Sequence, residues 1–251
     1  MKKGKASTIV LIVVLLCIVV VGAIVGILYF RNVRINYREE QEALLKEEIN
    51  RIVSEGKGTF EIDDNIVTKG SYVEVEELAK KYYKDYYSLS DNLKTEYSNY
   101  KDFIEKCLQA DNISKDQPEF TKTKNKIDKI IKVGEDTSSK IKEMQSDDYI
   151  EEQAETLSSE YNKNLFKECT STFKSMTYDT TLNSFIYNYN MYLRYLKYVF
   201  DFLANHKNDW NLNNGTLVFN SQNILDQYNS SINAMKQFES IFMSAYKRLE
   251  W

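Results

Sequence analysis

The residue types that most often carry catalysis are scarce in this chain. It contains one histidine, His206, and three cysteines. A nucleophilic serine or cysteine needs a neighbouring base, so such a pair would have to use His206. That histidine stands near the end of an expected helix, where a basic side chain stabilises the helix dipole. We therefore predict a structural role for His206 and no catalytic residue around it.

Cysteine and the known catalytic motifs add little chemistry. Cys107 and Cys169 each fall on the apolar face of an expected helix, which is typical of small buried side chains. The sequence leaves open whether a disulfide joins them. One histidine and two such cysteines cannot supply the four ligands of zinc without a carboxylate. The sequence has no H-E-x-x-H, Walker A, G-x-G-x-x-G or G-x-S-x-G pattern. We expect no metal and no cofactor.

Acidic residues offer the remaining route to catalysis or calcium binding. Counted as an EF-hand loop from Asp63, the run Asp63-Asp64-Asn65 places Val67 at a ligand position and Thr68 where the sharp turn requires glycine. We interpret the run as an acidic turn. Carboxylate catalysis by other acids stays open, because paired acids need no fixed spacing in the sequence.

Tyrosine is abundant, with 19 residues in the chain. Tyr82, Tyr83, Tyr86 and Tyr87 cover more than one face of an expected helix. Rigid aromatic side chains with a polar tip suit contacts with a protein or glycan partner. Helical cores also absorb tyrosine, and we favour that second interpretation.

The clearest element is the uncharged, mostly aliphatic run from Ala6 to Phe30. A helix of that length spans about 37 Å at 1.5 Å per residue, and the hydrocarbon core of a bilayer is about 30 Å thick. The run is too long for a cleaved signal peptide, whose apolar stretch has about 7–15 residues. We predict an uncleaved transmembrane signal anchor over residues 6–30, with the lipid bilayer as its partner.

The orientation of this anchor rests on a weaker argument. Basic residues precede the anchor, but Arg31, Arg34 and Arg38 follow it, so their count is not decisive. A short basic tail ahead of a first span usually stays in the cytoplasm, and a long domain is translocated largely regardless of its charge. We expect a cytoplasmic tail at residues 1–5 and an extracytoplasmic C-terminal domain at the cell membrane.

Two glycines of the anchor suggest an association between chains. Gly22 and Gly26 form a G-x-x-x-G pattern, which puts both on one helix face and lets a second backbone approach closely. Glycine is also common in membrane helices, so the spacing arises by chance as well. We state homodimerisation through Gly22 and Gly26 as a hypothesis.

Composition bounds both the fold and the partners. One proline and eight glycines favour helices over a turn-rich sandwich. The formal net charge is −4, and the part after the anchor is more acidic still because Lys2, Lys3 and Lys5 precede it. Phosphate contacts need clustered Lys and Arg, so we predict no nucleic-acid partner. Abundant Lys, Asn, Ile and Tyr are typical of AT-rich bacterial genomes.

The elements after the anchor are predicted from hydrophobic periodicity. Residues 31–57 are highly charged and lack proline, which predicts a helical juxtamembrane stalk that meets the domain through Leu45, Ile49 and Ile52. Apolar residues then recur at helical spacing over 75–89, 93–107, 120–144, 150–176, 182–203 and 224–249. Ser90-Asp91 and residues 111–118 are predicted breaks between helices. The strongest pattern, over 182–203, predicts a central helix.

Two segments predict β-hairpins. Asn214-Gly215 is the preferred centre of a type I′ turn, because both positions need positive φ, and Trp, Leu, Val and Phe flank it. Residues 59–62 and 66–68 flank the acidic turn and could form a second hairpin.

The fold class that follows is mainly α. A transmembrane helix and a helical stalk lead into a helical bundle over residues 58–251, an extracytoplasmic domain with one or two small β-hairpins. We favour a non-catalytic binding or assembly component of a bacterial cell envelope, with an unknown protein or glycan partner. The alternatives are a helical sensing module that works with a partner signalling protein and, less favoured, a carboxylate-based envelope enzyme.

Overall fold

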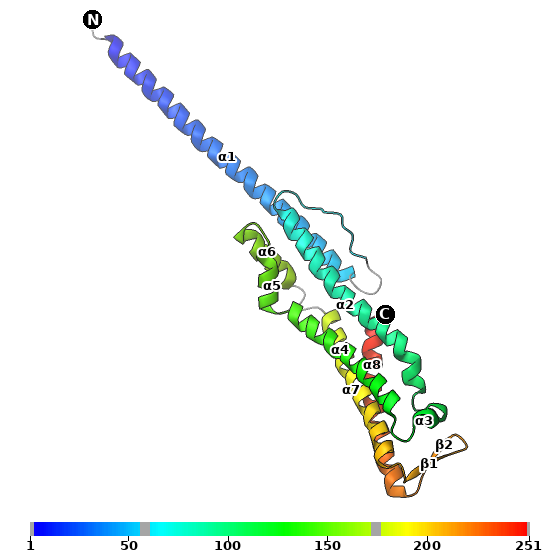
Figure 1. The fold of residues 1–251 in the computed structure, drawn as a ribbon. Coiled ribbons are helices and arrows are strands. Elements are labelled where there is room, and N and C mark those ends of the chain that lie inside the picture. The colour runs from blue at the N-terminus through cyan, green and yellow to red at the C-terminus, as the bar shows by residue number, and fades with distance from the viewer. Residues whose placement is uncertain (1–2, 56–60, 172–176, 250–251) are drawn as a thin grey trace.

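A computed structural model of the chain describes residues 3–55, 61–171 and 177–249. The molecule is elongated: one long helix leads from the N-terminus into a helical bundle, and the bundle continues away from that helix (Figure 1). In these residues the fold is mainly α, with one two-stranded hairpin, as predicted.

The first helix, α1 (Lys3–Glu55), runs without a break through the predicted anchor and the predicted stalk. By length and composition it is the one described helix long and apolar enough to cross a membrane. Its side chains from Val19 to Phe30 are largely exposed, which in water would be unfavourable for so large an apolar surface. A membrane-spanning segment accounts for this exposure.

The last turns of α1 belong to the bundle. Leu45, Ile49 and Ile52 are fully or almost fully buried, and they follow one another at helical spacing on the face that packs against the next helix. The predicted apolar stripe is therefore confirmed. The second half of the stalk is not a free spacer but a part of the domain core.

Seven helices and the hairpin follow α1 in the described residues. They are α2 (Tyr72–Lys106), α3 (Ala110–Asp116), α4 (Thr121–Met144), α5 (Asp147–Ala154), α6 (Glu160–Ser171), α7 (Thr177–Asn205), β1 (Trp210–Asn213), β2 (Thr216–Phe219) and α8 (Gln222–Arg248). Helix α7 packs most extensively against α8 and α4, and α2 joins α4, α6 and α1. The core therefore lies between α2, α4, α7 and α8.

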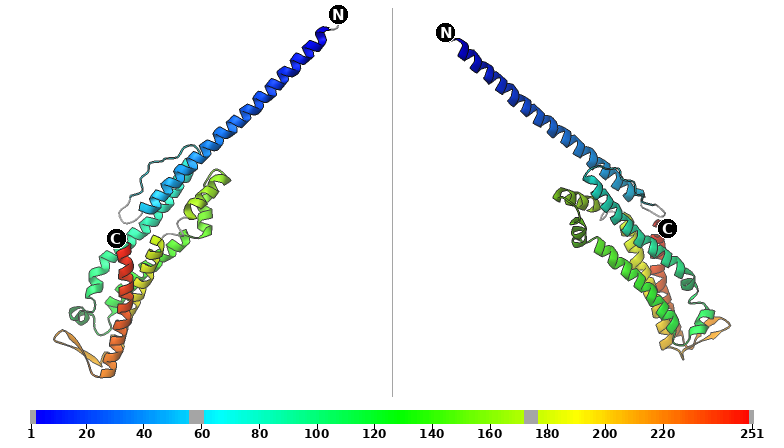
Figure 2. Two further views of the ribbon diagram at one scale, coloured as in Figure 1. Left: turned by 180° about the vertical axis from the view of Figure 1, so that it is seen from behind. Right: turned by 45° about the horizontal axis from the view of Figure 1, so that its top comes forward.

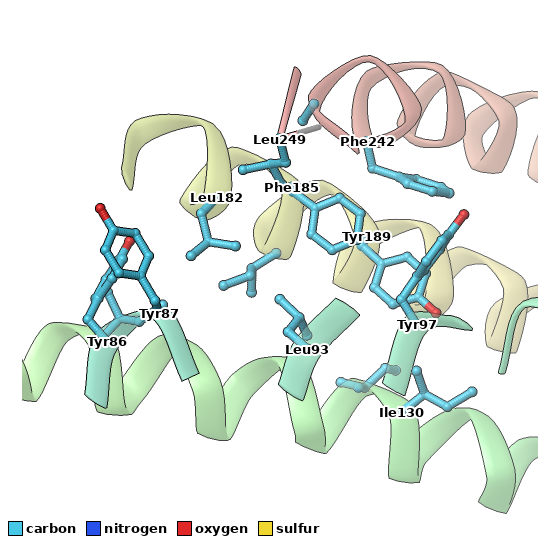
Figure 3. Close-up of a cluster of buried hydrophobic side chains, with 14 of the residues drawn as sticks. Tyr86, Tyr87, Leu93, Tyr97, Ile130, Leu182, Phe185, Tyr189, Phe242 and Leu249 are labelled. Carbon is cyan, nitrogen blue, oxygen red and sulfur yellow. The ribbon is translucent and has the colours of Figure 1, made fainter. Parts of the chain in front are cut away.

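The strong apolar pattern over 182–203 does form the central helix α7. Leu182, Phe185, Leu193 and Phe200 have no exposed surface, and Figure 3 shows Leu182 and Phe185 among side chains from the neighbouring helices. The helix is not covered all round, because Tyr187 on another face is 62 % exposed.

The hairpin around Asn214 and Gly215 is confirmed. Strands β1 and β2 pair antiparallel with Asn213 opposite Thr216, and both turn residues have positive φ, 48° and 79°, as a type I′ turn requires. Trp210 ties the hairpin to the bundle, because its indole N–H donates to the carbonyl of Leu203 at 2.7 Å. The hairpin lies at the end of the molecule opposite the N-terminus of α1 (Figure 2).

The prediction of a second hairpin is wrong over the described residues of that segment. Residues 61–69 contain no strand and instead run as an extended segment beside α1 and α2, while residues 59 and 60 lie outside the described ranges. A two-stranded hairpin is marginal in water, and this segment is stabilised by side chains of the two helices instead.

Three helix boundaries differ from the prediction. Helix α2 continues through Ser90, which is buried at 1 % exposure, so tertiary packing outweighs the weak helix propensity of serine. The loop expected over 111–118 contains the short helix α3. The helix expected over 150–176 is interrupted after Ala154, since the Ser159 hydroxyl accepts from the Asn162 amide at 3.1 Å and caps a new helix, α6.

Candidate functional site: the anchor junction and an aromatic pocket

The place where α1 enters the bundle contains a group of charged side chains, most of them buried, which we call the junction cluster: Glu48, Arg51, Glu76 and Lys80. Glu76 is fully buried, and Glu48 and Lys80 are nearly so. The Lys80 ammonium lies 2.8 Å from Glu48 Oε1 on α1 and 3.1 Å from Glu76 Oε1 on its own helix. One lysine therefore forms ion pairs with carboxylates from two helices.

Glu76 also binds the extended segment. Its carboxylate accepts from the amides of Val67 and Thr68 at 3.1 and 2.9 Å and from the Thr68 hydroxyl at 2.8 Å. Lys80 donates to the carbonyl of Asn65 in the same segment. Buried polar groups must be paired, and here the segment supplies the partners, so α1, α2 and residues 65–68 form one interlocked unit.

Arg51 completes the cluster from the solvent side. Its guanidinium donates to both oxygens of Glu48 at 2.8 and 2.7 Å and lies 3.4 Å from Asp63. The hydrogen bonds from Arg51 and then from Lys80 lower the pKa of Glu48 to about 2, against the opposing effect of burial. Burial disfavours charged Lys80, yet its bonds to Glu48 and Glu76 leave the pKa of Lys80 raised. Glu48 and Lys80 are thus both ionised near neutral pH.

A second set of contacts joins α1 to the bundle closer to the apolar segment. The Arg38 guanidinium stacks over the Tyr161 ring at 3.9 Å from its centroid and donates to Glu42 at 2.9 Å. The side-chain oxygen of Gln41 accepts from the Lys69 amide at 2.7 Å. The domain is therefore attached to α1 along several turns and not at one point.

The junction cluster supports structure more than catalysis. A general acid or nucleophilic carboxylate must reach a substrate, and both acids of the cluster are buried and hydrogen-bonded by bases. Asp63 and Asp64 of the predicted acidic turn face Arg51 and Lys84. No three histidine, cysteine or acidic side chains converge as metal ligands anywhere in the described ranges.

The four tyrosines considered as a partner surface lie inside the bundle. Tyr82, Tyr83, Tyr86 and Tyr87 are at most 9 % exposed. Their hydroxyls donate to Met144 O, Cys169 O, Asp179 Oδ1 and Ile52 O respectively. Figure 3 shows Tyr86 and Tyr87 at one end of the core. They are core residues. Their burial corrects the alternative interpretation, in which they form a contact surface for a partner.

The other residues considered for chemistry are separated. His206 lies near the end of α7 with Nδ1 3.0 Å from Asp209 Oδ2, as a helix-terminal residue. Cys107 and Cys169 are buried and free, and burial raises the pKa of each thiol to about 12. The structure brings none of the three together.

Gly22 and Gly26 lie on the part of α1 that projects from the bundle. A side chain added at either glycine would meet no atom within 4 Å. The face that carries them is open, which is the arrangement that close approach of a second helix requires.

A pocket that the sequence did not indicate lies between α2, α7 and α8. Its volume is about 320 Å³, at the lower end of the range for small-molecule sites. The wall consists of aromatic, apolar and a few charged side chains: Tyr97, Lys101, Ile104, Glu105, Leu108, Tyr189, Tyr192, Met235, Glu239, Phe242 and Met243. We call it the aromatic pocket.

The rings of the aromatic pocket contact one another. The ring centroids of Tyr189 lie 5.3 Å from Tyr97 and 5.2 Å from Phe242, and Tyr192 lies 5.2 Å from Phe242. Figure 3 shows Tyr97, Tyr189 and Phe242 meeting from three different helices. The Tyr189 hydroxyl is buried and has no hydrogen-bond partner, which is rare for a buried polar group.

Sequence reasoning missed both sites for the same reason. Glu76 and Lys80 have the four-residue spacing of an ordinary surface ion pair, and Tyr97, Tyr189 and Phe242 each belong to a regular apolar stripe. Only the packing of separate helices distinguishes them.

Comparison with known proteins adds no family, since no family model, no curated protein and no solved structure matches the chain.

Proposed function

We propose that this chain is a single-pass protein of a bacterial cell membrane whose helical domain acts outside the membrane as a non-catalytic binding or assembly component. The observation that supports this is the continuity of α1, which passes from the apolar segment into the buried junction cluster without a break. The anchor helix is therefore itself part of the domain core.

The position of the domain relative to the bilayer follows from α1. Tyr29 and Phe30 are exposed aromatic residues followed by Arg31 and Arg34, a combination typical of the membrane–water interface. Tyr37 contacts the domain, because its hydroxyl lies against Gly70. Seven helical residues rise about 10 Å, so the bundle would begin close to the lipid surface and extend away from it.

This geometry makes the hairpin the part of the domain farthest from the membrane. Strand β2 exposes Val218, and the turn at Asn214 is exposed. An anchored arm with an accessible distal end suits a component that reaches a partner in the envelope. Nothing in this proposal requires a catalytic group.

Orientation is tested by introducing one cysteine at a time and labelling it in intact cells whose surface is accessible. Asn214→Cys should react with a membrane-impermeant maleimide, and Lys3→Cys should react only after permeabilisation. The wild-type chain is the matched control, because Cys107 and Cys169 are buried and Cys17 lies within the apolar segment. Labelling of Lys3→Cys but not of Asn214→Cys would reverse the proposed orientation.

Partner binding is tested by photo-crosslinking in the same cells. A benzophenone amino acid at Val218, at the distal end, should give a discrete adduct, and the same group at Glu152 on α5 provides a surface control near the other end. If neither these positions nor further exposed positions along the domain give an adduct beyond background, the binding or assembly proposal fails.

A sensing module is the second candidate, and the aromatic pocket is the observation that favours it. A small-molecule pocket enclosed by three helices could couple ligand binding to helix packing, and α1 would transmit the change. This candidate predicts a saturable ligand, whereas the assembly component does not.

A further inference from the structure

The aromatic pocket combines a large aromatic surface with an acidic rim. Tyr97, Tyr189, Tyr192 and Phe242 form its inner wall, and each is at most 5 % exposed. Aromatic faces carry a negative quadrupole that attracts cations, and tyrosine is among the stronger rings. An anion would meet the unfavourable side of the same quadrupole.

The charged residues of the wall point to the same class of ligand. One lysine and two glutamates leave the pocket with an excess of one negative charge. Lys101 lies 3.9 Å from Glu105 on the same helix, and Glu239 has no ion-pair partner within the part of the chain that the structure describes. A bound cation at the rim would give Glu239 an ion-pair partner.

Burial and nearby charges both raise the pKa values of the tyrosines in the pocket. Burial first, and then the charges of Glu239 and Glu105 among other groups, raises the pKa of Tyr192. Burial, the neighbouring Tyr246 and the same two glutamates raise the pKa of Tyr97 to about 12. The phenols therefore stay neutral at physiological pH, so their hydroxyls keep their protons and their rings remain available to a cation.

The Tyr189 hydroxyl is the feature that ordinary core packing does not explain. It is buried without a partner, although Tyr82, Tyr83, Tyr86 and Tyr87 all have a partner for theirs. A phenylalanine would fill the same space without an unpaired hydroxyl. A ligand oxygen in the pocket could accept the hydrogen bond that the protein leaves unmade.

We propose that the aromatic pocket binds a small organic ammonium ion with a hydrogen-bonding oxygen near the charged group. The ammonium lies against the rings of Tyr97, Tyr192 and Phe242 with Glu239 as its counter-ion, and Tyr189 donates to the oxygen. This inference goes beyond the proposed function and does not depend on which side of the membrane the domain occupies.

The test compares two probes of the same shape on the full chain in a maltoside detergent, which carries no ammonium group. Choline has the ammonium and the hydroxyl, and 3,3-dimethyl-1-butanol replaces the nitrogen with carbon. Calorimetric titration should show one saturable choline site per chain and binding of the neutral probe at least about tenfold weaker, as a partly desolvated cation–π contact and ion pair predict. Equal affinities, or no saturable choline site, would overturn the proposal.

Single substitutions test the proposed contacts of the ligand with Glu239 and Tyr189. Glu239→Gln should weaken choline binding by about three- to tenfold and leave the neutral probe unchanged, whereas the exposed Glu152→Gln on α5 should change neither. Tyr189→Phe should weaken binding of both probes, because both carry the hydroxyl, without lowering the melting temperature. If Glu239→Gln and Glu152→Gln weaken choline equally, bulk charge and not the pocket is responsible. If Tyr189→Phe leaves binding unchanged, the hydroxyl contact is wrong.

Discussion

Removing the charge of Lys80 should destabilise the junction between α1 and the bundle, and Lys80→Met is the simplest change that does so. Methionine keeps most of the apolar stem and removes the ammonium, which lies 2.8 Å from Glu48 and 3.1 Å from Glu76. The next residue provides a matched control, because Lys81 forms an ion pair with Asp85 at 2.6 Å on the exposed surface of the same helix.

The expected magnitude follows from burial. Lys80 is 3 % exposed and Glu76 is fully buried, so the variant removes the cation beside Glu76 in the interior and leaves Glu48 with Arg51. Removing one partner of a buried ion pair costs about 3–5 kcal/mol, a large part of the roughly 5–15 kcal/mol that stabilises a typical domain. The Lys81 side chain is 62 % exposed, and Lys81→Met should change the free energy of unfolding by less than about 1 kcal/mol.

Urea unfolding of the full chain in detergent, followed by circular dichroism, measures this difference. Hydrogen exchange adds a local readout, since the amides of Val67 and Thr68 donate to Glu76 and should lose protection in Lys80→Met only. Replacing Glu48 and Glu76 with glutamine in the Lys80→Met background should recover part of the lost stability, because no buried charge then remains unpaired. A Lys80→Met variant as stable as Lys81→Met would refute the reasoning.

Three further predictions concern other parts of the chain. The pKa of Glu48 is lowered to about 2 from 4.5, so ionised Glu48 should contribute on the order of 3 kcal/mol to the free energy of unfolding. This contribution should be complete above pH 4.5 and be lost as the pH falls toward 2. Unfolding measured as a function of pH checks this, and Glu48→Gln should flatten the pH dependence between those two values. Gly134→Ala would bring a methyl group 2.9 Å from the buried Asn190 side-chain carbon, so it should cost about 1–3 kcal/mol by thermal unfolding. Adding Asn190→Ala should restore stability, and no recovery would mean that another contact is responsible. If Gly22 and Gly26 mediate dimerisation, leucine at either position should shift detergent-solubilised protein from dimer to monomer, and an unchanged monomer–dimer ratio would end that hypothesis.

The parts of the fold that sequence reasoning recovered depend on neighbouring residues alone. The type I′ turn needs positive φ at Asn214 and Gly215, and Asn-Gly supplies both without help from the rest of the chain. Hydrophobic periodicity likewise placed α7 at the centre, because a helix with a long apolar face must bury it.

The predictions that failed depend on residues far apart in the chain. Ser90 stays helical because other helices bury it, and residues 65–68 avoid a hairpin because Glu76 and Lys80 bind their backbone. The same applies to Tyr83, whose hydroxyl reaches the carbonyl of Cys169, 86 residues later. A side chain's own type does not reveal which distant group will cover it.

The sequence by itself determined that a long uncharged run precedes a helical domain and that this domain contains a hairpin at Asn214 and Gly215, since length, charge and turn chemistry are local properties. Tertiary structure alone decided what the charged and aromatic residues do. It placed Lys80 between acids of two helices, and it brought Tyr97, Tyr189 and Phe242 around one pocket. The physical reason is that burial and pairing are properties of the space between helices, which no single helix specifies.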